Sequence, residues 1–429
     1  MLTTWGNVSY VPGTPVFDYD FTTLTSLSGS ITFTRSTIGT YIDADGVMQS
    51  AAINAPRFQS QGGSRGLLIE QQRTNYLLRS QEFDNASWTK DNSTVTANAI
   101  AAPDGTTTAD LLVESATNAV HGFNQVQSGN STVATALTLF VKPKERSICR
   151  IDSTDGGVNF IRAYFNLSGA GSVSNISNNG TASGGAANIT QLANGWYRIE
   201  VSGIPATANS GSIRMTFRME TALGGTGYAG DGASGMYIWG AQLEPWSGGG
   251  ILPMFSSSYI ATTSAMVTRT ADSALITGAN FTSIFGAASQ GTMFAEALVP
   301  NTTFGFNYGL FGLSDNTANN CVQLMRLGNT GSPSTNVTTG GVQQAGLNPT
   351  PPAAWGSGKG RLALRFKAND FAAASNGGAV LTDVAGTVPT VTQAEIGSCV
   401  GLSAAQGIIT RLAFWPTALT DRQLQVITA

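Results

Sequence analysis

Apolar and polar residues alternate in several segments of this 429-residue chain, and this period of two constrains its fold more than any other feature. From Ser212 to Glu220 the odd positions are apolar and the even positions are polar or charged. A similar alternation occurs at residues 137–142, 198–202 and 361–366, with Phe140 and Ala363 as apolar residues in the polar positions. Because neighbouring side chains of a β-strand point to opposite faces, the pattern predicts antiparallel strands with one buried face.

Turn sequences separate these segments. Asp104-Gly105, Asn179-Gly180 and Asp231-Gly232 supply the positive φ angles that tight hairpins need. The composition agrees, with 51 glycines and only 11% charged residues. We therefore predict an all-β fold with two antiparallel β-sandwiches. One exception is the capping-box sequence Thr420–Gln423, which predicts a short C-terminal helix.

Apolar content and glycine-rich breaks divide the chain. Residues 1–66 contain short strand patterns but no stretch long enough to bury a core of its own, so we predict an extended N-terminal arm. Residues 67–247 are predicted to form the first sandwich, and the glycine-rich sequence after Trp246 begins a linker over residues 248–264. Residues 265–429 are predicted to form the second sandwich.

The charge balance limits the partners that we expect. The chain has 22 Lys and Arg against 25 Asp and Glu, a net charge of -3. We expect no nucleic-acid partner, because binding phosphates takes clustered basic residues. No apolar run reaches the ~18 residues of a membrane helix, and residues 1–6 lack a signal-peptide pattern. We expect no membrane insertion.

The scarce residue types limit the chemistry. The chain has one histidine, His121, which excludes zinc sites built from two histidines. Its three cysteines, Cys149, Cys321 and Cys399, contain no C-x-x-C pair. We expect them to be small buried hydrophobic residues of a protein assembled in a reducing cytoplasm. A disulfide between Cys321 and Cys399 is left open.

Four stretches resemble a modular pattern found in tail fibres, head spikes and other surface proteins of tailed bacteriophages and gene transfer agents. They follow the usual order of that pattern over about the first 270 residues. The matching segments are Phe33-Thr34-Arg35-Ser36, Pro56-Arg57-Phe58 and Gly66-Leu67-Leu68-Ile69-Glu70; Ser80-Gln81-Glu82-Phe83 with Ala102-Pro103-Asp104-Gly105; Asn194-Gly195-Trp196-Tyr197-Arg198 with Tyr237-Ile238-Trp239-Gly240-Ala241; and Ser258-Tyr259-Ile260 with Thr268-Arg269-Thr270-Ala271-Asp272.

This resemblance implies a virion structural protein, either a tail fibre or a head spike. The first sandwich would be a jelly roll like those of carbohydrate-binding modules, and it would bind host cell-surface polysaccharide during adsorption. The arm would dock the protein on other virion proteins at the particle surface, after assembly in the host cytoplasm. Such fibres are often trimers, so we expect a homo-oligomer and guess a trimer. A capsid or tail decoration protein that stabilises the particle without glycan binding is the alternative.

The C-terminal third resembles a concanavalin A-like or laminin G-like sandwich. The similarity lies in Gly291–Phe294, Arg361–Leu364, Ser375–Gly378 and Gly407–Pro416. Such domains are generally binding modules whose ligand sites lie in variable loops. The resemblance therefore implies no particular ligand residue in this part of the chain.

Aromatic rings are the expected saccharide contacts, because they stack on the apolar face of a sugar. The candidates are Trp88, Trp196, Tyr197, Tyr237, Trp239 and Trp246. His121 is a further candidate that could orient a sugar hydroxyl or a neighbouring carbonyl, and its alternative role is that of a structural histidine with satisfied hydrogen bonds. On alternation, Tyr237 and Trp239 share the face of a strand opposite to Met236 and Ile238. The alternative is that these rings pack in a sandwich core or an interface, which is the commoner role of large aromatics.

We predict no catalytic residue and no metal ligand. A capsule-degrading glycosidase is the less favoured alternative, and it would need two convergent carboxylates. The available pairs are Glu82/Asp84, Asp104/Asp110 and Asp152/Asp155. A structural calcium ion is left open at Asp152–Gly156 or Asp315-Asn316, where oxygen ligands cluster.

Overall fold

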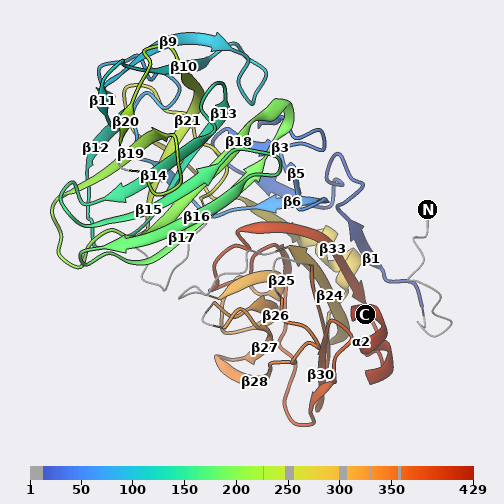
Figure 1. Ribbon diagram of the computed structural model, residues 1–429. Helices are drawn as coiled ribbons and strands as arrows, with labels where there is room; N and C mark the ends of the chain where they lie inside the picture. The colour runs from blue at the N-terminus through green and yellow to red at the C-terminus, as the bar shows by residue number, and fades with distance from the viewer. Residues whose placement is uncertain (1–12, 226, 247–255, 299–306, 329, 356–358) are drawn as a thin grey trace. The chain divides into compact units, whose positions relative to one another are not determined.

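A computed structural model describes residues 13–225, 227–246, 256–298, 307–328, 330–355 and 359–429 (Figure 1). The described residues form antiparallel strands, with short helices at α1 (Gly278–Phe285) and α2 (Asp421–Thr428). The predicted all-β class with two sandwiches is confirmed. No helix among the described residues is long and apolar enough to cross a membrane. The predicted C-terminal helix is α2, and the Thr420 side chain and Gln423 form its capping box.

The chain divides into two compact units. The first sandwich comprises residues 42–50 and 73–269, and the second comprises residues 1–41, 51–72 and 270–429. The first sandwich is therefore inserted into the sequence of the second. Each unit has its own hydrophobic core.

The first sandwich contains two six-stranded sheets. The order of one is β17 (Ser183–Gln191), β18 (Tyr197–Ile204), β13 (Ala134–Pro143), β21 (Gly235–Trp246), β10 (Ala109–Glu114) and β9 (Ser93–Ile100). The other, here called the groove sheet, has the order β16 (Ser172–Asn179), β15 (Phe160–Asn166), β14 (Ile148–Thr154), β19 (Ser212–Glu220), β12 (His121–Ser128) and β8 (Thr89–Asp91). Smaller pairs are β11 (Asn118–Ala119) with β20 (Tyr228–Ala229), and β7 (Arg73–Asn75) with β22 (Val267–Arg269). A 3₁₀ turn occupies Ala193–Gly195.

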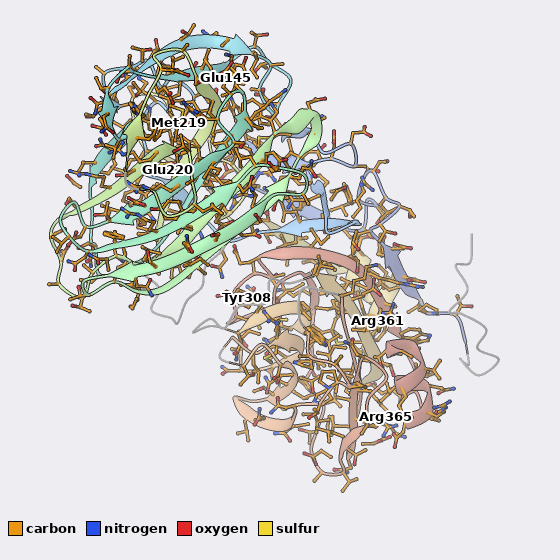
Figure 2. All side chains as sticks on the ribbon, in the orientation of Figure 1. Glu145, Met219, Glu220, Tyr308, Arg361 and Arg365 are labelled. Carbon is orange, nitrogen blue, oxygen red and sulfur yellow. The ribbon has the colours of Figure 1, made fainter. Side chains whose placement is uncertain are left out.

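The alternation in β19 places its two sets of side chains as the sequence predicts. Ile213, Met215, Phe217 and Met219 are at most 1% exposed and lie in the core between the two sheets. The even positions, among them Glu220, point to the other face of the sheet. Figure 2 draws the described side chains and labels Met219 and Glu220 near the end of this strand.

The second sandwich also contains two large sheets. One has the order β31 (Leu381–Asp383), β30 (Asp370–Ser375), β29 (Gly360–Lys367), β24 (Gln290–Leu298), β33 (Gly407–Trp415), β6 (Ser64–Ile69) and β5 (Arg57–Gln61), and β1 (Phe17–Asp20) also pairs with β33. The other has the order β2 (Thr32–Thr34), β23 (Ser273–Thr277), β32 (Gln393–Ile396), β25 (Tyr308–Ser314), β26 (Cys321–Arg326), β27 (Pro333–Thr339) and β28 (Val342–Leu347). β3 (Gly39–Ile42) pairs with β4 (Met48–Ala51).

The N-terminal segment is not an extended arm, which corrects the predicted boundary at residue 66. β1 and β6 both pair with β33, more than 300 residues later in the chain. Phe17, Phe21 and Phe58 are at most 4% exposed in the core of the second sandwich. The segment lacks a core of its own because its apolar residues complete one whose other residues come mostly from the C-terminal third. Residues 1–12 of the predicted arm lie outside the described residues.

Four charged residues form a buried ion cluster in the second sandwich. Arg35 Nη1 lies 3.2 Å from Asp272 Oδ1, and Arg57 Nη2 lies 2.5 Å from Asp272 Oδ2. Arg57 also pairs with Glu70 at 2.7 Å. The two arginines and Asp272 have side chains that are 0% exposed. The cluster thus joins three segments that are far apart in the sequence.

Replacement of Asp272 by Asn should lower the free energy of unfolding by about 3–5 kcal/mol, because two buried guanidinium groups lose their shared counter-ion. Chemical denaturation of the full chain measures the change. Asp421→Asn is the control, since Asp421 pairs with Arg365 at the surface and is 55% exposed; its loss should cost less than about 1 kcal/mol. Equal losses for the two variants would contradict the assigned role of the cluster.

Candidate functional site

Four of the six predicted aromatic contacts are buried inside the first sandwich. Trp88, Trp196, Tyr197 and Trp239 are 1–4% exposed. Trp88 packs against Phe83, with 4.9 Å between ring centroids, and its Nε1 donates to the Arg79 carbonyl. The prediction that these four rings bind saccharide is therefore wrong, because a buried ring has no free face for a sugar.

Trp239 shows why alternation of apolar and polar residues did not predict which aromatic rings are exposed. It does lie on the face of β21 opposite to Met236 and Ile238, as expected. That face is covered by a second small core to which Phe140, Tyr259 and Trp196 also belong. The Trp239 ring lies 4.8 Å from Tyr259 and 5.4 Å from Phe140 between centroids. Alternation separates two faces of a strand but does not show whether loops cover the outer one.

Tyr237 and Trp246 remain partly exposed, but they do not form one platform. They lie nine positions apart on β21, so roughly 30 Å separates them along the strand. The Arg73 guanidinium lies 3.7 Å from the centroid of the Trp246 ring system and occupies one of its faces. Neither residue adjoins the other predicted contacts in an open site.

His121 is a structural histidine, which corrects its predicted contact with sugar. The residue is 0% exposed. Its Nδ1 lies 2.7 Å from the Asn92 carbonyl oxygen, and its Nε2 lies 3.2 Å from that of Tyr228. Its imidazole ring also packs against the Tyr228 ring, at 4.7 Å between centroids. Both ring nitrogens therefore have backbone neighbours.

Most of the carboxylates considered for catalysis or calcium have local partners. Asp110 accepts hydrogen bonds from the backbone amides of Phe83 and Asn98, and burial raises the pKa of its carboxyl. Asp104, Asp155 and Asp315 accept bonds from residues of their own turns. No group of three or more His, Cys, Asp or Glu able to hold a metal forms among the described residues.

The three cysteines are buried free thiols, as predicted for small hydrophobic residues. Cys149 is 0% exposed, Cys321 1% and Cys399 2%. Burial raises the pKa of each thiol. The disulfide left open between Cys321 and Cys399 is absent from the structure.

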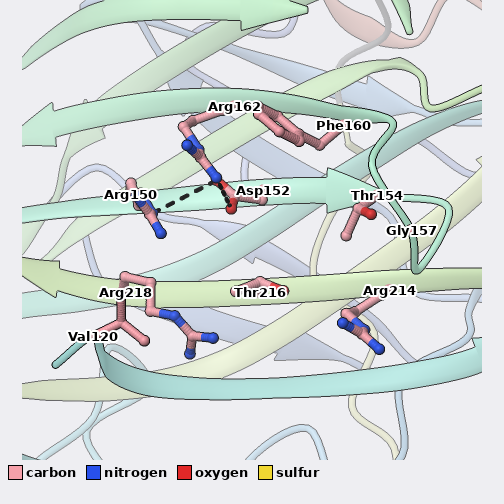
Figure 3. A pocket seen from close by; sticks show the side chains of 10 residues that line it. All are labelled: Val120, Arg150, Asp152, Thr154, Gly157, Phe160, Arg162, Arg214, Thr216 and Arg218. Atoms are coloured by element: carbon pink, nitrogen blue, oxygen red, sulfur yellow. Dashed lines mark hydrogen bonds and ion pairs between the residues drawn. The ribbon is translucent and has the colours of Figure 1, made fainter. Parts of the chain in front are cut away.

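A groove of about 290 Å³ lies on the outer face of the groove sheet (Figure 3). Strand pairing places its central residues in three rungs across β15, β14 and β19. These rungs are Arg150–Arg218, Arg162–Asp152–Thr216 and Phe160–Thr154–Arg214, and Tyr164, which does not line the groove, pairs with Arg150 on its other side. Because each residue occupies an outward position of a paired strand, the sheet fixes the spacing of the side chains.

Four arginines dominate the groove, and three of them have carboxylate partners. Arg162 Nε and Nη2 each lie 2.7 Å from an oxygen of Asp152. Arg218 Nη1 lies 2.6 Å from Asp91 Oδ2. Arg150 Nη1 lies 3.3 Å from Glu220 Oε1.

Arg214 is the exception. No described side chain forms an ion pair or hydrogen bond with it, and its buried Nε has no hydrogen-bond partner. On the neighbouring rung, the Thr216 hydroxyl makes no hydrogen bond to a described residue. Figure 3 shows Arg214 and Arg218 flanking Thr216, with both guanidinium groups on the same side of it. The groove therefore holds one guanidinium whose donors are available to a ligand.

The sequence contained a signal for this groove. The even positions of residues 212–220 include Arg214, Arg218 and Glu220, so a charged outer face could be read from the alternation. The net charge of -3 gives no indication of this cluster, because the net charge sums over the whole chain and does not report local groups of like charge. Arg150 and Arg162 come from two other strands, and only the strand pairing brings them beside β19.

Known proteins that resemble this chain do so at low sequence identity and low TM-score. No family model matches the chain, and no curated protein matches it. A solved structure titled "Ruminococcus gnavus IT-sialidase CBM40 bound to alpha2,3 sialyllactose" is 20% identical, with 33% of this chain and 83% of that chain covered and a TM-score of 0.28.

Two other solved structures are similar at the same level. Mouse laminin alpha1 chain, domains LG4-5, is 8% identical over 70% of this chain and 87% of that chain, with a TM-score of 0.23. Trypanosoma rangeli sialidase is 10% identical over 92% and 66%, with a TM-score of 0.28. At these TM-scores the similarities carry no argument about this chain, so its fold class rests on the sheets described above.

Replacement of Trp239 by Ala should act on stability. Deletion of this buried ring should lower the free energy of unfolding by about 3–5 kcal/mol, as measured by chemical denaturation. Trp246→Ala is the control: its ring is only half-buried, so the loss should be smaller. A Trp239→Ala protein of unchanged stability would contradict the buried position of this indole.

Proposed function

We propose that this chain is a saccharide-binding protein and that the groove on the groove sheet holds the ligand. The observation that supports this most is the open, donor-rich groove on an otherwise regular sheet face. Guanidinium and threonine hydroxyl groups can donate to sugar oxygens. Val126, which is 45% exposed and lies opposite Arg214 on β12, offers apolar surface to a sugar ring. The Arg162 guanidinium lies 4.2 Å from the centroid of the Phe160 ring and occupies one of its faces.

The groove is built on strands, which suits recognition by fixed geometry. Arg150, Asp152 and Thr154 belong to the central strand β14, which pairs with β15 on one side and β19 on the other. The opposite face of these strands is anchored in the core by residues such as Ile151 and Phe217, both 0% exposed. A site on a packed sheet holds its donors in place before the ligand arrives.

The size of the groove favours a weak single site. Its volume of about 290 Å³ lies at the small end of ligand pockets, which span roughly 300–1,000 Å³. Several linked copies would convert weak binding into useful avidity. We therefore propose a homo-oligomer, with a trimer as the expected form.

A glycan array probed with the purified full chain should identify saccharides that it binds. The double variant Arg214→Ala/Arg218→Ala should lose at least tenfold in affinity for those saccharides, because hydrogen bonds that involve a charged group such as guanidinium are worth about 1.5–3 kcal/mol each. Arg422→Ala, an exposed arginine of α2, is the control for loss of positive charge. Unchanged binding by a folded double variant would place the saccharide site elsewhere.

We further propose that the protein belongs to the surface of a tailed-phage particle and contributes to adsorption. The support is the resemblance of four sequence stretches to phage fibre and spike proteins. Antibodies against the purified protein should label particles of the phage that encodes it, as seen by electron microscopy, and should block adsorption to host cells. Labelling without any effect on adsorption would favour the decoration protein, and absence of label from the particles would contradict a virion role.

A further inference from the structure

We propose that the groove recognises an anionic saccharide and that Arg214 holds its carboxylate. This inference rests on the proposed function, because it takes the groove to be the saccharide site. It adds the chemical class of the ligand and the residue that determines specificity. The support comes from the charges, contacts and burial of the groove residues.

The first step is the charge balance of the groove. Arg150, Arg162, Arg214 and Arg218 carry four positive charges, and the carboxylates within 4 Å of them are Asp91, Asp152 and Glu220. Asp155, on the neighbouring turn, accepts hydrogen bonds from Gly157 and Asn159 of that turn. Among the residues that the structure describes, one positive charge of the groove is left without a counter-ion, which matches a ligand with one negative charge.

The second step concerns the state of Arg214 itself. An arginine side chain stays charged at physiological pH, and a buried donor without a partner costs about 1–3 kcal/mol. The buried Nε of Arg214 is such a donor among the described residues. Arg150 Nε, in the same groove, is a second such donor. These Nε atoms are enclosed by the protein, so a ligand would instead meet the terminal Nη groups of Arg214, which form no ion pair or hydrogen bond with a described residue.

The third step is the arrangement of like charges. Arg150 and Arg218 lie directly opposite each other on β14 and β19, and like charges at such positions destabilise a sheet. Glu220, two positions from Arg218 on β19, and Asp91, on β8, offset this repulsion through their ion pairs with Arg150 and Arg218. A ligand carboxylate beside Thr216 would lie between Arg214 and Arg218 and would add a negative charge where the arginines converge.

A carboxylate fits the donors better than a neutral hydroxyl does. Its two oxygens accept parallel hydrogen bonds from the fork of one guanidinium, and the free Thr216 hydroxyl is an additional donor on the next rung. Sulfate esters also carry one negative charge. The planar fork favours the planar carboxylate, and the experiment includes sulfated sugars as a separate arm.

The test uses pairs of saccharide probes that differ only in charge. Oligosaccharides that contain glucuronate or galacturonate are each compared with their methyl esters, and sulfated and neutral oligosaccharides form two further sets. Binding to the full chain is measured by calorimetry at low salt. We expect the acids to bind about 10- to 100-fold more tightly than the esters, with a preference that falls as salt is added.

Variants of Arg214 assign the preference to this residue. Arg214→Gln should abolish the preference for acids over esters, and Arg214→Lys should retain part of it, because lysine keeps the charge but lacks the fork. Arg422→Gln is the matched control and should change nothing. The lysine variant keeps the test informative if the glutamine variant does not fold.

The possible outcomes separate the two proposals. Acids and esters bound with equal affinity would overturn this inference and leave the proposed function standing. A preference that survives in the folded Arg214 variants would overturn the role of Arg214, and tighter binding of sulfated sugars would overturn the choice of carboxylate. Failure of every probe, neutral sugars included, would count against the proposed function itself.

Discussion

The buried ion cluster around Asp272 is the interaction on which the architecture depends. The chain leaves the second sandwich at residue 72 and returns to it at residue 270, and residues 73–269 in between make up most of the first sandwich. The Glu70 amide donates to Asp272 Oδ2 at 2.8 Å, and the Asp272 amide donates to the Glu70 carbonyl at 2.9 Å. A domain can be inserted into another when the two ends of the insertion are held close together. The cluster holds these ends and neutralises Arg35 and Arg57 in the same place.

This nested connectivity marks the limit of what the sequence could predict about the fold. Alternation predicted the strands and their buried sides, as Ile213 and Met215 show, and the capping box at Thr420 predicted the last helix. Neither signal identifies the partner of a strand. Phe17 pairs with Phe414, a separation at which no local pattern carries information. The local pattern before residue 66 therefore predicts an arm, although the apolar residues of this segment belong to the core of the second sandwich.

The candidate site, like the fold, could be predicted from the sequence only where a local pattern was enough and not where strand pairing decides. The outward position of Arg214 and Arg218 could be predicted from a single strand, but their grouping with Arg150 and Arg162 depends on the register of three strands. The aromatic prediction failed for a related reason. Trp239 does lie on an outer face, yet Tyr259, which arrives from outside the sheet, covers it. The face of the strand to which these side chains point could be predicted from the sequence, whereas tertiary packing decides which of them are exposed to solvent.

The arginines of this protein have two different roles: some are buried and stabilise the fold, and others lie in the groove, where they can bind a ligand. Arg35 and Arg57 are deeply buried and both form ion pairs with Asp272, so their charges serve the connection between distant segments. Arg214 lies on an open face, and among the described residues it has no counter-ion. Its positive charge adds to those of the three other groove arginines, and this repulsion is a free-energy cost in the free protein. A ligand that supplies the missing charge turns this cost into binding energy, and this makes the groove the part of the structure where recognition is the best physical explanation.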